Sequence, residues 1–301
     1  MDFEAAPADF REDVGRALAD GRRGDLALLA IETRGLRWGV EGLRVVGRAQ
    51  LELRDWEGAR ESWEGVREAR PEDAEAAARL AAVRGKLREA SASAVRARRH
   101  VFVFTGHRID AADRVASGAG ARFPAEMEPV ARGAVRRALV EELGRGDEEA
   151  VGIAGGASGG DIIFHEVCAE LGVKSYLYLA VPREEYVAAS VRDAGPVWVR
   201  RFERLYDALE RRVLSSSEGP PRWLREKGEG YSVWQRCNLW MLANAVALCR
   251  EGGGSDLTLV ALWNGSKGDG AGGTEDMIRQ AEGRGARTVI LHTGQLFGLG
   301  G

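Results

Sequence analysis

The feature that most constrains the fold is a set of three glycine-rich turns, each of which follows a short apolar segment typical of a β-strand. The turns are 105–108, 155–161 and 270–274. Glycine lets the backbone approach a ligand closely, and a turn that opens a helix presents free N–H groups and the positive end of the helix dipole. This pattern predicts a binding site for a phosphate-bearing ligand.

Strands and helices alternate from residue 100 onward. The predicted strands are 101–104, 150–154, 174–181, 257–263 and 288–292, and the predicted helices are 124–143, 161–171, 182–213, 232–249 and 275–282. Such alternation forms a mostly parallel sheet with helices on both faces, and ligands bind at the carboxyl ends of its strands. We therefore predict an α/β, Rossmann-like fold for this part of the chain.

The first 97 residues read as helices without strands. A set of residues in this part has the spacing of the tetratricopeptide repeat, a helix–turn–helix unit of roughly 34 residues: Leu43, Val46, Gly47, Ala59, Trp63 and Pro71. We predict about five helices and two domains, an all-α, tetratricopeptide-like domain at 1–97 and the Rossmann-like domain at 98–301. A plain helical bundle is the alternative to the repeat. Either arrangement suggests an element that binds a partner.

Composition narrows the class of protein. Hydrophobic residues make up 45% and charged residues 30% of the 301 residues, as in ordinary globular proteins, and the formal net charge of -3 gives no general attraction to nucleic acid. Cys168, Cys237 and Cys249 lack the spacing of metal ligands. Cys168 and Cys249 lie in apolar helical segments, where we expect them to be buried. No signal peptide or apolar run of ~20 residues is present, so we expect a cytoplasmic protein without metal or membrane association.

The second turn is the richest in glycine. Four glycines surround Ser158 and precede Asp161, whereas one or two would suffice for a tight turn without a ligand. Ser158 either caps the following helix or donates its hydroxyl to a phosphate. The predicted ligand residues of this turn are Gly155, Gly156, Ser158, Gly159, Gly160 and Asp161.

The first turn offers a histidine and an arginine. Arg108 either binds phosphate with its planar guanidinium or pairs with Asp110 or Glu166, and His107 is either an acid/base, a ribose contact or a structural hydrogen-bonding group. The predicted ligand residues of the first and third turns are Thr105, Gly106, His107, Arg108, Asn264, Gly270, Gly272, Gly273 and Thr274.

Two further polar residues belong to the predicted site. Tyr231 lies near a loop and could stack on a base. Asn238 lies on an otherwise apolar helix and would need a partner if buried, either a ligand or a backbone carbonyl.

The turns together resemble the SLOG superfamily of Rossmann-like domains. The resemblance is carried by Val-Phe-Thr-Gly-His-Arg from Val103, Gly-Gly-Ala-Ser-Gly-Gly-Asp from Gly155, Trp-Asn-Gly from Trp263 and Gly-Ala-Gly-Gly-Thr from Gly270. The superfamily includes the "lonely guy" phosphoribohydrolases and the bacterial DNA-processing protein. The chain is more similar to bacterial proteins that join a tetratricopeptide-type region to a SLOG domain, which implies sensing or processing of nucleotide-derived signals in stress or antiviral pathways.

The chain departs from the enzyme branch of that superfamily. Phosphoribohydrolases carry Pro-Gly-Gly-x-Gly-Thr-x-x-Glu, and alignment on Gly273 and Thr274 puts Met277 at the position of the glutamate. Methionine can neither accept a proton nor stabilise a positive charge in the transition state. A glycosidase would have to use Glu275, Asp276 or Glu166 instead.

The resemblance and the turns lead to one prediction and two alternatives. We predict a sensor that binds an NAD-, ADP-ribose- or cyclic-nucleotide-like ligand, and whose helical part binds a protein partner or a second copy of the chain, as in a homodimer. The first alternative is an N-glycosidase that acts on nucleoside monophosphates or NAD-like cofactors. The second, a binder of single-stranded nucleic acid, conflicts with the lack of positive charge.

Overall fold

The computed structural model describes residues 6–93, 99–111, 120–144, 149–215, 219–228, 230–251, 256–266 and 272–299. Its centre is a six-stranded sheet, all of whose strands are parallel, in the order β4-β3-β2-β1-β5-β6. The strands are β1 Arg99–Gly106, β2 Glu149–Ala154, β3 Lys174–Leu179, β4 Glu210–Val213, β5 Leu257–Trp263 and β6 Arg287–His292. The predicted α/β fold with a parallel sheet is confirmed.

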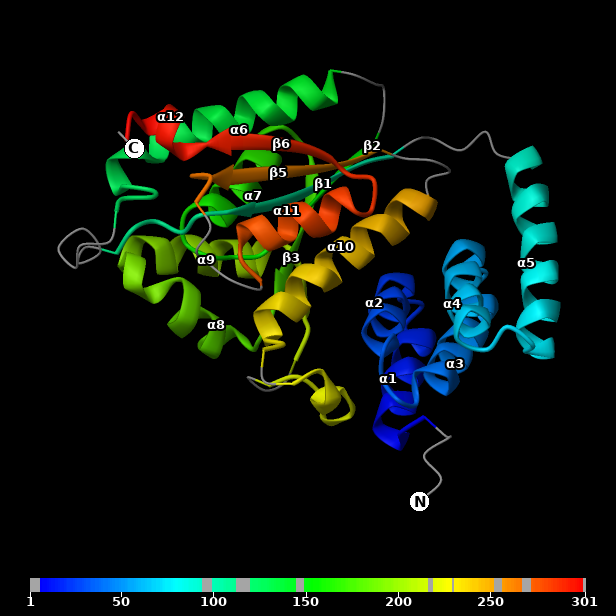
Figure 1. The fold of residues 1–301 in the computed structure, drawn as a ribbon. Helices are drawn as coiled ribbons and strands as arrows, with labels where there is room; N and C mark the ends of the chain where they lie inside the picture. Colours follow the sequence, from blue (N-terminus) through cyan, green and yellow to red (C-terminus); the bar gives the residue numbers. More distant parts are fainter. Residues whose placement is uncertain are drawn as a thin grey trace.

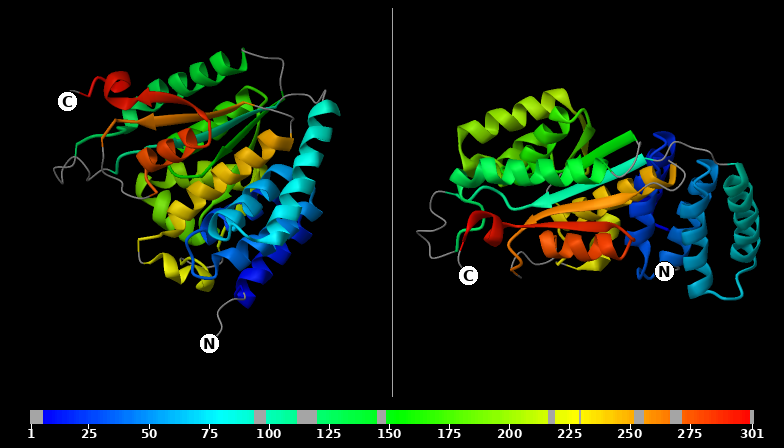
Figure 2. Two further views of the ribbon diagram at one scale, coloured as in Figure 1. Left: turned by 45° about the vertical axis from the view of Figure 1, so that its right-hand side comes forward. Right: turned by 90° about the horizontal axis from the view of Figure 1, so that it is seen from above.

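Helices cover both faces of the sheet (Figures 1 and 2). One face carries α6 (Glu128–Leu143), α7 (Gly160–Glu170) and α9 (Pro196–Ala208), and the other carries α10 (Val233–Glu251) and α11 (Thr274–Glu282). The short elements are η1 (Ala125–Met127), α8 (Arg183–Ser190), η2 (Arg192–Ala194), η3 (Arg222–Lys227) and α12 (Thr293–Phe297). Because β1 is central and covered on both faces, its apolar run Val101–Phe104 is almost completely buried.

Within residues 6–93, five helices precede the sheet, as predicted: α1 (Ala8–Ala19), α2 (Arg23–Thr33), α3 (Gly39–Glu52), α4 (Trp56–Ala69) and α5 (Ala74–Ser93). Trp63 of α4 is fully buried against α3, and a Cβ on Gly47 would lie 2.8 Å from the Trp63 Nε1. This small residue opposite a large one agrees with the repeat spacing. Whether these helices form a domain of their own stays a prediction.

The N-terminal helices pack on α10, whose neighbour is α2 (Figure 1). Polar contacts in this interface are buried or partly buried. Arg236 of α10 forms an ion pair with Glu32 of α2 at 2.7 Å, and Tyr231 donates its hydroxyl to the same carboxylate at 2.7 Å. One turn along α10, the Trp240 indole donates to Asp25 at 2.5 Å. The interface therefore depends on matched polar pairs as well as apolar area.

The sequence prediction misses one strand. The segment 182–213, predicted as helical throughout, contains α8, η2 and α9 and then ends in β4. This strand lies at the edge of the sheet, and most of its residues are exposed. Its sequence, Glu-Arg-Arg-Val, therefore lacks the apolar pattern of a covered strand.

Two further predictions concern the burial of the cysteines and the absence of a membrane-spanning helix. Cys168 is buried as expected, whereas Cys249 is only partly buried. Among the described residues, no helix combines the length and the apolar character needed to cross a bilayer.

Removal of the Glu32 charge tests the α2–α10 interface. Glu32→Gln is expected to lower the free energy of unfolding by about 3 kcal/mol, because Arg236, 7% exposed, would keep a buried charge without its counterion. Urea titration measures the change. The matched control is Arg37→Gln, which breaks an exposed pair with Glu226 and should cost less than about 1 kcal/mol. Equal losses in both variants would contradict the assignment.

Candidate functional site

The first turn meets the residue that directly follows β5, Asn264, at the point where the strand order reverses. From β1 the chain builds β2, β3 and β4 on one side, and then returns to place β5 on the other side of β1. In open α/β sheets, ligands bind outside the carboxyl ends of the strands at this point. His107, directly after β1, has its Nε2 3.1 Å from both the Oδ1 and the backbone N of Asn264, directly after β5. Thr105 and Gly106 end β1 in register with Ala261 and Leu262 of β5.

The first and second turns are packed backbone against backbone. Gly159 has a φ of +94°, and a Cβ there would lie 2.6 Å from the Ile109 N. Two hydrogen bonds join the turns: Gly160 N donates to His107 O, and Ile109 N donates to Ser158 O, both at 3.2 Å. This closeness explains why glycine occupies position 159.

The second turn uses most of its own N–H groups internally. The N–H of Gly156 donates to the Tyr186 hydroxyl at 2.9 Å, that of Ala157 to the Asp161 carboxylate at 3.2 Å, and that of Ser158 to Ser190 O at 2.9 Å. With Gly160 bonded to His107, this turn is not an open cradle of donors for phosphate. Its glycines instead permit tight packing.

Ser158 does not cap α7. The N-cap residue is Gly159, and no side chain caps the helix. The Ser158 side chain is completely buried, and its hydroxyl has no hydrogen-bond partner within the described part of the chain.

His165 of α7 holds the second turn in place through its hydrogen bonds. This residue is not among those predicted from the sequence. Its Nε2 donates to Gly155 O and its Nδ1 accepts from the Ser175 hydroxyl of β3, both at 2.9 Å. Burial lowers the pKa of His165 to about 4, so the ring is neutral at pH 7. A histidine directly after the apolar run Ile162–Phe164 was the available signal.

Asp161 is the charged group of the second turn. Its Oδ2 and the Tyr186 hydroxyl lie side by side over Gly155, at 2.7 and 2.9 Å from the position of a Cβ on that residue. Although Asp161 keeps partial contact with solvent, surrounding protein raises its pKa to about 7. Burial, followed by the charge of Asp161, raises the pKa of Tyr186 well above its usual value. Asp161 therefore titrates near neutrality.

The start of α10 supports the third turn. Asn238 donates its amide to Gly272 O at 2.7 Å, so the partner of this residue is a backbone carbonyl. A Cβ on Gly272 would lie 3.0 Å from the Gln235 N. Gly273 is the N-cap residue of α11, and Thr274 is its first, buried residue. Gly270 lies outside the described residues.

Asp276 repeats the arrangement of Asp161. It lies four residues after Gly272 and accepts the N–H of that glycine at 3.1 Å, as Asp161 accepts the N–H of Ala157. Unlike Asp161, it also pairs with an arginine, Arg279. Glu275 precedes it in the first turn of α11 and is partly buried.

Three predicted site residues have other partners. Glu166 lies between α6, α7 and α9, where it pairs with Arg201 and Arg132 at 2.7 Å each. Tyr231 is engaged by Glu32 in the α2–α10 interface, so its hydroxyl does not face the turns. Arg108 donates to Ala189 O at 2.8 Å and pairs with Asp193 at 3.1 Å.

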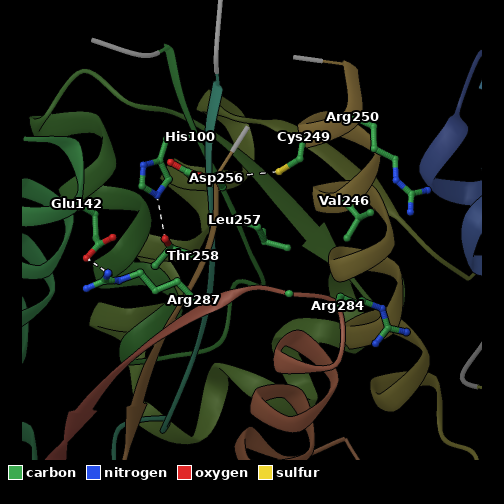
Figure 3. Close-up of a pocket in the computed structure, with 11 residues that line it drawn as sticks. His100, Glu142, Val246, Cys249, Arg250, Asp256, Leu257, Thr258, Arg284 and Arg287 are labelled. Atoms are coloured by element: carbon green, nitrogen blue, oxygen red, sulfur yellow. Dashed lines mark hydrogen bonds and ion pairs between the residues drawn. The ribbon is translucent and has the colours of Figure 1, made fainter. Parts of the chain in front are cut away.

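A pocket of about 380 Å³ lies at the opposite, amino edge of the sheet (Figure 3). Arg287 pairs there with Glu142 at 3.2 Å, and Arg250 pairs with Glu61 of α4. Arg250 stands in the last turn of α10, where the helix dipole favours a cation, and Arg287 neutralises Glu142 near the end of α6. This pocket therefore has a structural explanation for its arginines, and the carboxyl edge is the better candidate site.

Comparisons with known proteins add no assignment: no family model, curated protein or solved structure matches the chain. Within the described ranges, no group of three or more His, Cys, Asp and Glu residues could hold a metal ion.

Substitution of Gly159 tests the contact between the first two turns. Gly159→Ala is expected to lower the free energy of unfolding by about 3 kcal/mol, since it adds both a strained φ and a clash with the Ile109 backbone. Gly172→Ala is the control, because Gly172 also has a positive φ, +72°, but open space around it, and should cost about 1 kcal/mol. Urea unfolding of both variants compares them, and similar losses would show that the turns are not in contact.

The raised pKa of Asp161 predicts a pH-dependent stability. A carboxyl with a higher pKa in the folded protein favours folding while protonated, and this advantage is lost as the pH rises from about 3.8 to about 7. Asp161→Asn removes that loss. The Tm of the variant relative to the wild type should therefore increase between pH 4 and pH 7 and stay level above pH 8.

The control for this titration is Asp207→Asn, the same change at an exposed position of α9. Its Tm difference from the wild type should stay constant over the same range. A flat profile for Asp161→Asn would show that Asp161 has an ordinary pKa. His165 titrates in all three proteins, so its effect cancels in the differences.

Proposed function

We propose that the protein binds a phosphate-bearing adenine-nucleotide derivative at the carboxyl edge of its sheet. The observation that carries the proposal is the position of the first turn and of Asn264, the residue directly after β5. They flank the point at which the strand order reverses, and His107 and Asn264 contact each other across it. The ligand is NAD-, ADP-ribose- or cyclic-nucleotide-like in this proposal.

The phosphates belong near the start of α11. Gly273 and Thr274 open this helix, so its first N–H groups and its dipole favour an anion there. Asp276 in the same turn would repel a phosphate, but its pairing with Arg279 and with the Gly272 N–H offsets that charge. The second turn, whose donors are used internally, contributes shape and the Asp161 carboxyl instead.

The helix α10 supports the role of a relay. Its first turns contact the third turn through Gln235 and Asn238, and its Trp234 ring lies 5.6 Å from that of Tyr186 beside the second turn. The same helix holds Glu32 through Arg236. A ligand that moves the start of α10 would thus act directly on the buried contacts of α2.

Binding without cleavage is the proposed activity. Met277 at the position of the hydrolase glutamate is buried in the core, and Glu166 and Asp276 are held by arginines. Together with the resemblance to SLOG domains, this supports a cytoplasmic sensor in bacterial stress or antiviral signalling. The N-terminal helices would pass the signal to a protein partner or to a second copy of the chain.

A nucleotide panel tests the proposal. Calorimetry and thermal shift with ATP, ADP, NAD, ADP-ribose and 3′,5′-cyclic AMP are expected to identify at least one ligand. Asn264→Asp should weaken its binding at least about tenfold, since it adds a negative charge beside the phosphate site. The substitution keeps the oxygen that accepts from Ser266 N, so the loop should stay folded.

The matched control is Gln280→Glu, which makes the same change of charge near the amino edge and keeps the oxygen that accepts from Arg284. Its affinity should equal that of the wild type. Absence of binding across the panel would overturn the proposal, as would equal weakening by both variants. Release of free base from AMP or NAD, abolished by Glu275→Gln, would show that the ligand is cleaved.

A further inference from the structure

The second turn contains a hydrogen-bond acceptor, Asp161, although its glycine pattern is typical of a turn that binds phosphate through backbone N–H groups. Gly156, Ala157, Ser158 and Gly160 donate their N–H groups to protein atoms. The charged residue of the turn is Asp161, which is partly exposed. A carboxylate repels phosphate and accepts hydrogen bonds from hydroxyl or amino groups.

Asp161 has spare capacity for such a bond. Its Oδ2 accepts one N–H, that of Ala157. Its Oδ1 has no hydrogen-bond partner, and no cation pairs with it, within the part of the chain that the structure describes. The comparable carboxylate of Asp276 differs in this respect, because Arg279 compensates it. Asp161 is therefore an uncompensated acceptor at the site edge.

A hydroxyl group lies close to this acceptor. The Asp161 Oδ2 and the Tyr186 hydroxyl lie 2.7 and 2.9 Å from the same point, the position of a Cβ on Gly155. The surroundings thus suit a ligand group that can both donate and accept hydrogen bonds, as a hydroxyl does.

The spacing of the strands fits one part of a nucleotide. The second turn follows β2, which lies next to β1 on the side away from β5. Neighbouring strands are about 4.8 Å apart, so the second turn, after β2, is about two strand spacings from the proposed phosphate position at the start of α11, which follows β5. A ribose lies at that kind of distance from the terminal phosphate of its 5′-diphosphate.

We infer that Asp161 binds the vicinal hydroxyls of the ligand's ribose, so that the second turn selects ribonucleotides over deoxyribonucleotides. Each hydroxyl donates to the carboxylate in a charge-assisted bond, the same chemistry by which acidic residues hold ribose in dinucleotide-binding folds. This inference rests on the proposed function, since it assigns a role within the same nucleotide site.

The test uses the full-length protein at pH 8, where Asp161, with a pKa of about 7, is ionised. The probes are ADP, 2′-deoxy-ADP and 3′-deoxy-ADP, measured by calorimetry. The wild type should bind ADP at least about tenfold more tightly than either deoxy analogue, which corresponds to the loss of a hydrogen bond to a charged group. Asp161→Asn should reduce this preference to about twofold or less, because it weakens the bonds from both hydroxyls. Asp207→Asn should behave as the wild type.

The outcomes separate the two claims. If ADP and both deoxy analogues bind the wild type equally well, or if Asp161→Asn keeps the full preference, the ribose assignment is overturned and the nucleotide site stands. If none of the three probes binds the wild type, and no nucleotide of the panel in the preceding subsection binds either, the proposed function fails and the inference fails with it. A cooperative thermal unfolding transition of Asp161→Asn serves as the check that the variant is folded.

Discussion

The structure of the candidate site depends on the close contact between the backbone of Gly159 and residues 107–109. Any side chain at Gly159 would displace the Ile109 N, and the two hydrogen bonds between the turns would be lost. Because the first turn is held in this way, His107 reaches Asn264 beyond the end of β5. The contact thus links three neighbouring strands at their carboxyl ends, where a parallel sheet directs its ligands.

Strand and helix order could be predicted from the sequence because buried strands have a simple pattern. Val101–Phe104 and Leu257–Trp263 are apolar runs that end at glycine turns, and both are covered on two faces. The strand β4 could not be predicted, since an edge strand with polar residues does not need that pattern. The tight packing of Gly47 against Trp63 was predictable from the repeat spacing, because small and large residues must alternate where helices approach.

The site was harder to predict because hydrogen-bond partners are set by the tertiary structure. The second turn follows β2 as the strand pattern predicts, but its N–H groups are bonded to Tyr186, Asp161, Ser190 and His107, which the sequence does not reveal. Tyr231 precedes α10 by two residues, yet its hydroxyl points to Glu32, almost two hundred positions away in the chain. Local patterns therefore located the turns, whereas the roles of single side chains required the fold.

A crystal structure of the protein with bound ADP-ribose tests the central claim most directly. The account predicts a diphosphate between His107 and the start of α11, and a ribose whose hydroxyls lie within hydrogen-bond distance of Asp161. A ligand bound in the pocket at the amino edge, with the turns at the carboxyl ends of β1, β2 and β5 unoccupied, would contradict it.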